Sequence, residues 1–179
     1  MNLIDCSYFY VGPLQIMNAR PIDDLDNNAA AVQEAITGYI ERYQDEFLLK
    51  MVGKDVADVV TDHLAHLEAY QQALADAQVG EEPEPYVNEA AEELCEHLRP
   101  SFAHYIYFKI AGDVNQTMTI TGLMKLKSAN DNQPPLQRMV KVWNDMVQLN
   151  KQFVAWAEES DYDVFYHVEM ITPINQFNL

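Results

Sequence analysis

Residues 27–53, NNAAAVQEAITGYIERYQDEFLLKMVG, carry the clearest fold signal in this chain. Apolar residues recur there at spacings of three and four, which places one apolar stripe along a helix of about 25 residues. Asn27 or Asn28 is suited to cap the start, and Gly53 stands where a helix commonly ends in a left-handed residue. We therefore predict a helix over 28–52. Its stripe comprises Val32, Ile36, Tyr39, Ile40, Tyr43, Phe47 and Met51.

The same periodicity predicts three further helices. One runs from about Asp55 to Ala77 and is expected to pack against the first helix across the break at Gly53. The next runs from about Tyr86 toward Ile110, with Pro100 as a kink or interruption, and the last opens at Pro134-Pro135. The expected buried residues are Val56, Val59, Val60, Leu64, Leu67, Tyr70 and Leu74 in the second helix, Leu94, Leu98, Phe102, Ile106 and Ile110 in the third, and Leu136, Met139, Val140, Trp143, Met146, Val147, Phe153 and Val154 in the last.

A change to period two marks residues 116–127, QTMTITGLMKLK. This alternation predicts a strand or a small hairpin with Gly122 at a bulge or bend. A second short strand is predicted over Val164–Val168. The tail over Ile171–Leu179 is expected to be extended, either docked on its own core or added as a strand to a neighbouring chain. The predicted fold class is mainly α: four main helices packed as a bundle, with a small β hairpin or short strands and an extended C-terminal tail.

The length of 179 residues is that of one domain. We predict a single domain over 1–179. Its parts are an irregular N-terminal segment (1–27), three helices with an acidic linker at 80–85 (28–110), a β hairpin and loop (111–133), a long helix (134–157), and a short strand with the extended tail (158–179).

The charge of the chain is strongly negative and unevenly distributed. Its 11 Lys and Arg residues against 28 Asp and Glu residues give a net charge of −17, which excludes general binding to nucleic-acid phosphates and disfavours anionic membranes. Residues 55–98, the acidic segment, hold 12 acids and no Lys or Arg, whereas residues 99–151, the basic segment, hold 7 bases and 3 acids. The acidic segment must therefore face water, face a cation-rich surface, or pair with the basic segment of its own or another copy.

The sequence carries no sign of export. The first residues lack the basic and apolar regions of a signal peptide, and no apolar run is long enough to span a membrane. Cys6 and Cys95 are too few for a disulfide framework. We expect a soluble protein made in a reducing cytosol, with both thiols free.

Catalytic motifs are missing. The glycines form neither GxGxxG nor a P-loop, and GxSxG is absent. His63 and His66 are interpreted as surface histidines of an acidic helix rather than as metal ligands. Cys95 and His97 point in different directions on a helix, and the surrounding glutamates raise the thiol pKa, which opposes nucleophilic activation. We expect no enzymatic activity, no cofactor and no metal.

Large aromatic side chains are the other candidates for a role. The run Tyr105–Phe108 is apolar all round, so it is expected either between helices or at an interface. Because aromatic groups dominate contact energetics, Tyr105, Tyr107, Trp143 and Phe177 are the predicted packing or interface anchors.

Three sequence fragments carry a resemblance to a known family. They are Ile36-x-x-Tyr39-Ile40-x-x-Tyr43-x-x-Glu46-Phe47-Leu48 leading into Gly53, Trp143-Asn144-x-Met146, and Ile174-Asn175-x-Phe177. In these fragments the chain resembles the small, mainly helical head–tail connector (adaptor) proteins of tailed phages and prophages. The resemblance implies a ring of identical subunits, typically twelve, that docks beneath the portal, joins it to the tail, and has no catalytic residues.

Three functions remain in competition at this point. The leading hypothesis is a virion connector made in the host bacterial cytoplasm, whose partners are its own copies, the portal protein and downstream neck or tail proteins, with neither membrane nor specific nucleic-acid binding. The alternative is an acidic inhibitor that mimics DNA and occupies the basic groove of a host nucleic-acid enzyme. A small enzyme is the third, without a residue constellation to support it. The residues expected on an acidic lumen or partner face are Glu81, Glu82, Glu84, Glu89, Glu92, Glu93 and Glu96.

Overall fold

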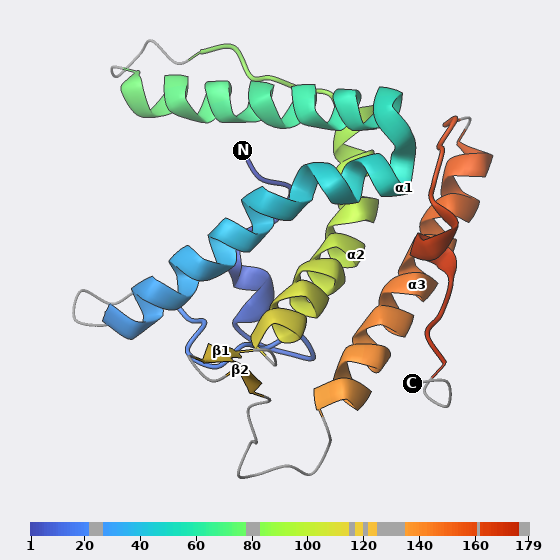
Figure 1. Ribbon diagram of the computed structural model, residues 1–179. Coiled ribbons are helices and arrows are strands. Elements are labelled where there is room, and N and C mark those ends of the chain that lie inside the picture. The colour runs from blue at the N-terminus through green and yellow to red at the C-terminus, as the bar shows by residue number, and fades with distance from the viewer. Residues whose placement is uncertain are drawn as a thin grey trace.

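The computed structural model describes residues 1–21, 27–77, 83–114, 117–119, 122–124, 135–160 and 162–175. These residues form a mainly helical protein, as predicted (Figure 1). The elements are η1 (Cys6–Phe9), α1 (Asn27–Asp76), α2 (Glu89–Val114), β1 (Thr117–Thr119), β2 (Gly122–Met124), α3 (Pro135–Glu159) and η2 (Val168–Ile171).

Helix α1 changes direction at Gly53, which has φ 76° and ψ 176°. The predicted left-handed glycine is therefore confirmed. The described residues form three helices, because the two helices predicted on either side of Gly53 follow each other directly across this kink. Gly53 is the one non-helical residue within α1, so no loop separates the two parts of this helix. We call residues 27–52 the first arm of α1 and residues 54–76 the second arm.

The two arms diverge from the bend, and the N-terminus lies in the angle between them (Figure 1). The N–H of Leu3 donates to Gln44 Oε1 on the first arm at 2.6 Å, and the amino group of Met1 pairs with Glu68 on the second. The two predicted helices are thus joined through residues 1–3. Val59 and Leu74, predicted to be buried, are 48% and 40% exposed. Val59 lies on a different side of the helix from its buried neighbour Val60, and Leu74 lies near the end of the arm.

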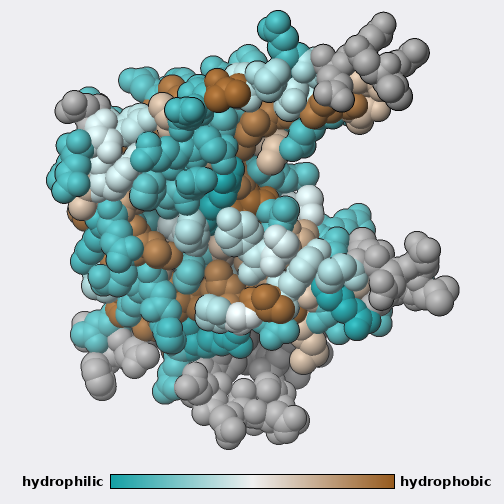
Figure 2. Space-filling model, turned by 180° about the vertical axis from the view of Figure 1, so that it is seen from behind, coloured by the Kyte–Doolittle hydropathy of each residue, from teal (hydrophilic) through white to brown (hydrophobic). Residues whose placement is uncertain are grey.

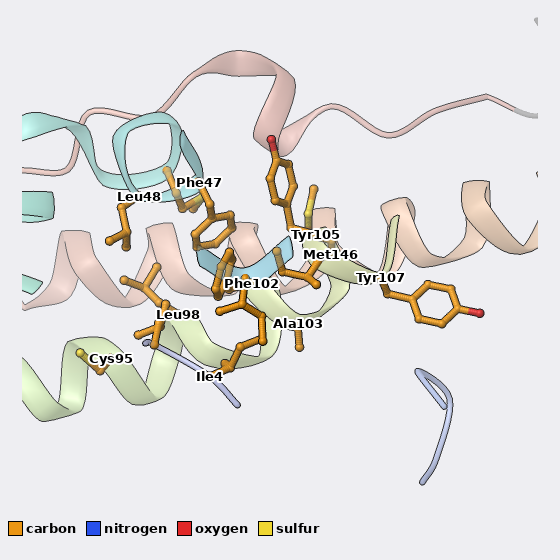
Figure 3. Close-up of a cluster of buried hydrophobic side chains, with 14 of the residues drawn as sticks. Ile4, Phe47, Leu48, Cys95, Leu98, Phe102, Ala103, Tyr105, Tyr107 and Met146 are labelled. Carbon is orange, nitrogen blue, oxygen red and sulfur yellow. The ribbon is translucent and has the colours of Figure 1, made fainter. Parts of the chain in front are cut away.

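Helix α2 is the central helix and packs on both α1 and α3. Its predicted core residues Leu94, Leu98, Phe102 and Ile106 are completely buried. The rings of Phe47 and Phe102 lie 5.0 Å apart in this core (Figure 3).

Helix α2 differs from the prediction at its first residue and at Pro100. It begins at Glu89 rather than near Tyr86, because the Asn88 side chain accepts a hydrogen bond from the N–H of Ala91 and caps the first turn. Pro100 lies inside the helix without interrupting it.

Helix α3 begins at Pro135, as predicted, and holds the C-terminal segment against itself. The Asn144 side chain donates to the carbonyl oxygen of Ile174 at 3.0 Å and accepts from its N–H at 2.8 Å. Trp143 Nε1 donates to the carbonyl oxygen of Thr172 at 3.0 Å. Of the two alternatives for the tail, docking on its own chain therefore holds for residues 172–175.

The strand predicted over Val164–Val168 does not form. The backbone of this segment forms hydrogen bonds with carbonyl groups of α1 instead. The N–H of Phe165 donates to the carbonyl oxygen of Val52, and the N–H of His167 donates to the carbonyl oxygen of Lys50. The carbonyls at the end of a helical arm have no partners within that arm, so a nearby extended segment can satisfy them without a sheet. The short strands β1 and β2 pair antiparallel, with Met118 opposite Leu123 and Thr119 opposite Gly122.

Candidate functional site

A cavity of about 540 Å³ lies beside the second arm of α1, and we call it the arm groove. Residues 83–88 run back along this arm (Figure 1). Tyr86 in this segment stacks on His66 with ring centres 5.1 Å apart. Viewed from behind, the molecule is hollowed between the protruding arm and the body (Figure 2). The groove is lined by Met1, His63, Leu67, Tyr86, Val87, Asn88, Glu89, Glu92, Glu93, Glu96 and Arg99.

The structure brings four of the seven predicted acidic residues to this groove. Glu89, Glu93 and Glu96 are exposed along the N-terminal half of α2. Glu92, the fourth, is half-buried. Glu84 is exposed but does not line the cavity, and the predicted residues Glu81 and Glu82 lie outside the described residues.

Glu92 differs from the other three because it is bound internally. Its carboxylate lies 2.9 Å from His63 Nε2 and 2.7 Å from Arg99 Nη1. Burial raises the pKa of this carboxyl, but the hydrogen bonds from Arg99 and His63 outweigh burial and lower it. Arg99 Nε also donates to the carbonyl oxygen of Leu3 at 3.2 Å. Glu92 therefore joins the second arm, α2 and the N-terminal segment, and is not free to meet a partner.

The interpretation of His63 as a surface residue is wrong. Its side chain is 2% exposed, and its Nδ1 lies 3.3 Å from the hydroxyl of Tyr86. A carboxylate only accepts, so Nε2–H donates to Glu92. The signal that could have located His63 is its place in the apolar pattern, three residues after Val60 and one before Leu64, both buried.

The predicted aromatic anchors lie on two sides of α2. Tyr105 is 2% exposed and donates its hydroxyl to Glu46 at 2.8 Å. The ring of Tyr107 points away from the core cluster and lies 5.0 Å from the guanidinium of Arg138 (Figure 3). Trp143 packs on Phe108 with ring centres 4.8 Å apart. Phe177 lies outside the described residues.

Cys6 and Cys95 are both buried, and neither forms a disulfide. Burial raises the pKa of Cys95 to about 11; Arg99 lowers it and Glu92 raises it. The predicted direction is confirmed, although burial rather than the glutamates is the main cause. Cys6 Sγ lies 3.4 Å from Thr37 Oγ1. His97 stacks on Trp156 with ring centres 4.2 Å apart and has no contact with Cys95 in the described structure.

A second cavity, of about 670 Å³, lies between residues 1–10 and the first arm and shares Met1 and Arg99 with the arm groove. Its polar groups bind one another: Gln33 Nε2 donates to the Tyr10 hydroxyl and to the carbonyl oxygen of Arg20, both at 2.7 Å.

In the described part of the chain, no three His, Cys, Asp or Glu side chains are grouped to hold a metal ion.

The described structure defines a mainly helical protein with a partly apolar groove whose rim carries carboxylates. Comparisons with protein-family models, with curated proteins and with solved structures find no significant match. Across the described residues, no helix is both long and apolar enough to cross a membrane.

Proposed function

We propose that this protein is a head–tail connector (adaptor) subunit of a tailed phage, a non-enzymatic virion protein that assembles as a ring of identical copies beneath the portal. The observation that carries the proposal is the separation of exposed charge. Glu84, Glu89, Glu93 and Glu96 are exposed and form no ion pair with another described residue. An assembly of identical copies offers such a surface either a basic partner surface or a channel.

Several cations of the same copy are already paired with other carboxylates. Arg99 is held by Glu92, Lys109 lies 3.4 Å from Glu46, and Lys141 lies next to Asp145 in an i,i+4 pair. These pairs leave the carboxylates of the groove rim without a described partner. Facing a channel, the carboxylates would repel DNA phosphates and let duplex DNA pass without sticking.

The fragments that carry the family resemblance occupy packing positions, as the proposal requires. In the first fragment Ile36, Ile40 and Phe47 are buried on the first arm. The other two fragments contact each other through the paired hydrogen bonds between Asn144 and Ile174. We propose that the helical body provides the rigid wall of the ring, and that the segment containing β1–β2 supplies contacts to neighbours.

The proposal assigns definite partners: other copies of this chain, the portal protein, and downstream neck or tail proteins in the virion. It is tested by measuring the mass of the purified protein in solution, with and without the portal protein of the same phage. We expect a symmetric oligomer, or a complex in which many copies bind one portal ring. A strict monomer that does not bind portal would contradict the proposal.

A second candidate, an acidic inhibitor that mimics DNA, is favoured by one observation. Glu89, Glu93 and Glu96 are exposed at i, i+4 and i+7, so their carboxylates follow one side of α2. Such an inhibitor would bind a nucleic-acid enzyme of the host, and DNA would compete for the site. Competition by duplex DNA, together with failure to bind portal, would select this candidate over the connector.

A further inference from the structure

We propose that the arm groove receives residues 117–127 of a second copy of this chain, so that identical subunits join head to tail. The inference rests on the proposed self-assembly and adds the two surfaces that meet.

The groove combines apolar walls with an anionic rim. Leu67 lines the groove from the second arm, and Tyr86 lines it from the segment that runs back along this arm. Val87, which is 70% exposed, also lines the groove. The carboxylates of Glu93 and Glu96 stand on the α2 side. Apolar walls gain free energy by excluding water, and a rim of one sign selects an occupant of the opposite sign. The fitting occupant is an apolar segment that carries lysines or arginines.

This chain contains one such segment. Residues 117–127, TMTITGLMKLK, include five large apolar residues, Lys125 and Lys127, and no acid. In the described part of this region, β1 and β2 pair with each other and make few contacts with other described elements. A segment of this composition, apolar and cationic, is suited to a partner surface.

Because of where β1 and β2 lie, the proposed contact between the arm groove and residues 117–127 must join two copies of the chain. These strands lie at the end of the molecule opposite to the second arm of α1 (Figure 1). One copy therefore offers the groove at one end and its occupant at the other. A contact between two different surfaces repeats from copy to copy and produces a ring when the rotation closes, or a filament when it does not.

Arg138 and Lys141, two exposed cations of α3, are weaker candidates for the same groove. Arg138 lies over the ring of Tyr107 and donates to the carbonyl oxygen of Pro13 at 3.2 Å, and Lys141 is next to Asp145. Binding a neighbour there would first require these contacts to break.

The test uses two charge-reversed full-length chains, Glu93→Lys/Glu96→Lys and Lys125→Glu/Lys127→Glu. Each is studied alone and in an equimolar mixture, under the condition in which the wild-type chain assembles, with portal if portal is required. Light scattering gives the mass of each sample. We expect each variant alone to need at least about tenfold higher concentration than wild type to assemble, since like charges then meet at every contact. We expect the mixture to assemble as wild type does, because both kinds of contact are then complementary.

The matched control is Glu158→Lys/Glu159→Lys, which makes the same charge change at exposed positions near the end of α3. It should assemble normally. If wild type assembles but the two variants also do, or if mixing fails to restore assembly, the inference is wrong while the connector proposal stands. If wild type is monomeric with and without portal, the connector proposal itself fails, and the inference fails with it.

Discussion

At the scale of single residues, Glu46 is the carboxylate that contacts the side chains of Lys50, Lys109 and Tyr105. It lies 2.9 Å from Lys50 Nζ and 3.4 Å from Lys109 Nζ, and it accepts the hydroxyl of Tyr105 at 2.8 Å. Lys50 Nζ in turn lies 2.8 Å from the carboxylate of Glu169 in η2. Glu46 therefore links the first arm of α1, α2 and the C-terminal segment.

We predict that Glu46→Gln destabilises the protein by about 1 kcal/mol at neutral pH, a modest value because the side chain is 36% exposed. Burial raises the pKa of Glu46, but the hydrogen bonds from Lys50 and Tyr105 and the charge of Lys109 outweigh burial and lower it from 4.5 to about 2. Its contribution is therefore complete above pH 4.5 and is lost as the pH falls toward 2. Thermal unfolding from pH 7 to pH 2 should show the difference between wild type and variant shrinking through that window.

Glu41→Gln provides the matched control, since Glu41 is an exposed acid on the same arm. It should change the melting temperature little at any pH. A Glu46→Gln variant whose destabilisation stayed constant from pH 7 to pH 2 would show that the ionised carboxylate is not the stabilising species.

Asn150 shows how one buried amide can orient several elements. It is completely buried on α3, accepts from the hydroxyl of Ser101 on α2, and donates to the carbonyl oxygen of Met170 at 2.6 Å. A buried amide without such partners would be strongly unfavourable. The spacing of apolar residues in the last predicted helix indicated which of them are buried. No feature of the sequence indicated that Asn150 is buried.

At the scale of elements, the bend of α1 and the segment 162–167 depend on each other. An added Cβ at Gly53 would lie 3.0 Å from Cβ and 3.2 Å from the carbonyl oxygen of Phe165. The same segment satisfies the carbonyls of Lys50 and Val52 at the end of the first arm. The bend is thus stabilised by a segment more than 100 residues later in the chain.

We predict that Gly53→Ala lowers the free energy of unfolding by about 2–3 kcal/mol. A backbone at φ 76° and ψ 176° is unfavourable for a residue with a Cβ, and the new methyl group would meet Phe165. Urea unfolding followed by circular dichroism measures the change.

The control is Gly38→Ala on the first arm, where a Cβ would meet nothing within 4 Å. Alanine is the better helix former, so this variant should gain about 0.5–1 kcal/mol. If both substitutions shifted stability in the same direction, the special role of the Gly53 backbone would be refuted.

At the scale of the whole molecule, a net charge of −17 acts against the compact state. The described ion pairs offset only part of this repulsion, since Glu89, Glu93 and Glu96 in the arm groove form no ion pair with another described residue. Dissolved salt screens exposed charges more than half-buried pairs such as those of Glu46 and Glu92.

We therefore predict that raising NaCl from about 20 to about 300 mM increases the melting temperature by roughly 3 °C, equivalent to about 1 kcal/mol for a chain of this size. The measurement is made at a concentration below the onset of assembly, so that only folding contributes. A melting temperature that falls with added salt would mean that attractive ion pairs dominate instead.

Much of the helical content could be predicted because periodicity is a local property. Leu94, Leu98, Phe102 and Ile106 follow a helical spacing and are buried, and Gly53 stands at the turn where the pattern breaks. The Val164–Val168 prediction failed because an extended backbone segment is the same locally whether its partner is a strand or the carbonyls of a helical arm. His63 was misplaced because periodicity ranks hydrophobicity, and a histidine is buried only when partners such as Glu92 and Tyr86 are brought to it.

By itself, the sequence determined the helices, their apolar stripes, the glycine bend and the uneven distribution of charge, since each depends on neighbouring residues. The tertiary structure decided which carboxylates are bound and which are exposed. Glu92 and Glu93 are adjacent in the chain, yet Glu92 contacts His63 and Arg99, while Glu93 lines the open groove. Glu92 meets a histidine 29 residues earlier and an arginine two turns later, whereas Glu93 does not, because successive residues of a helix point in different directions.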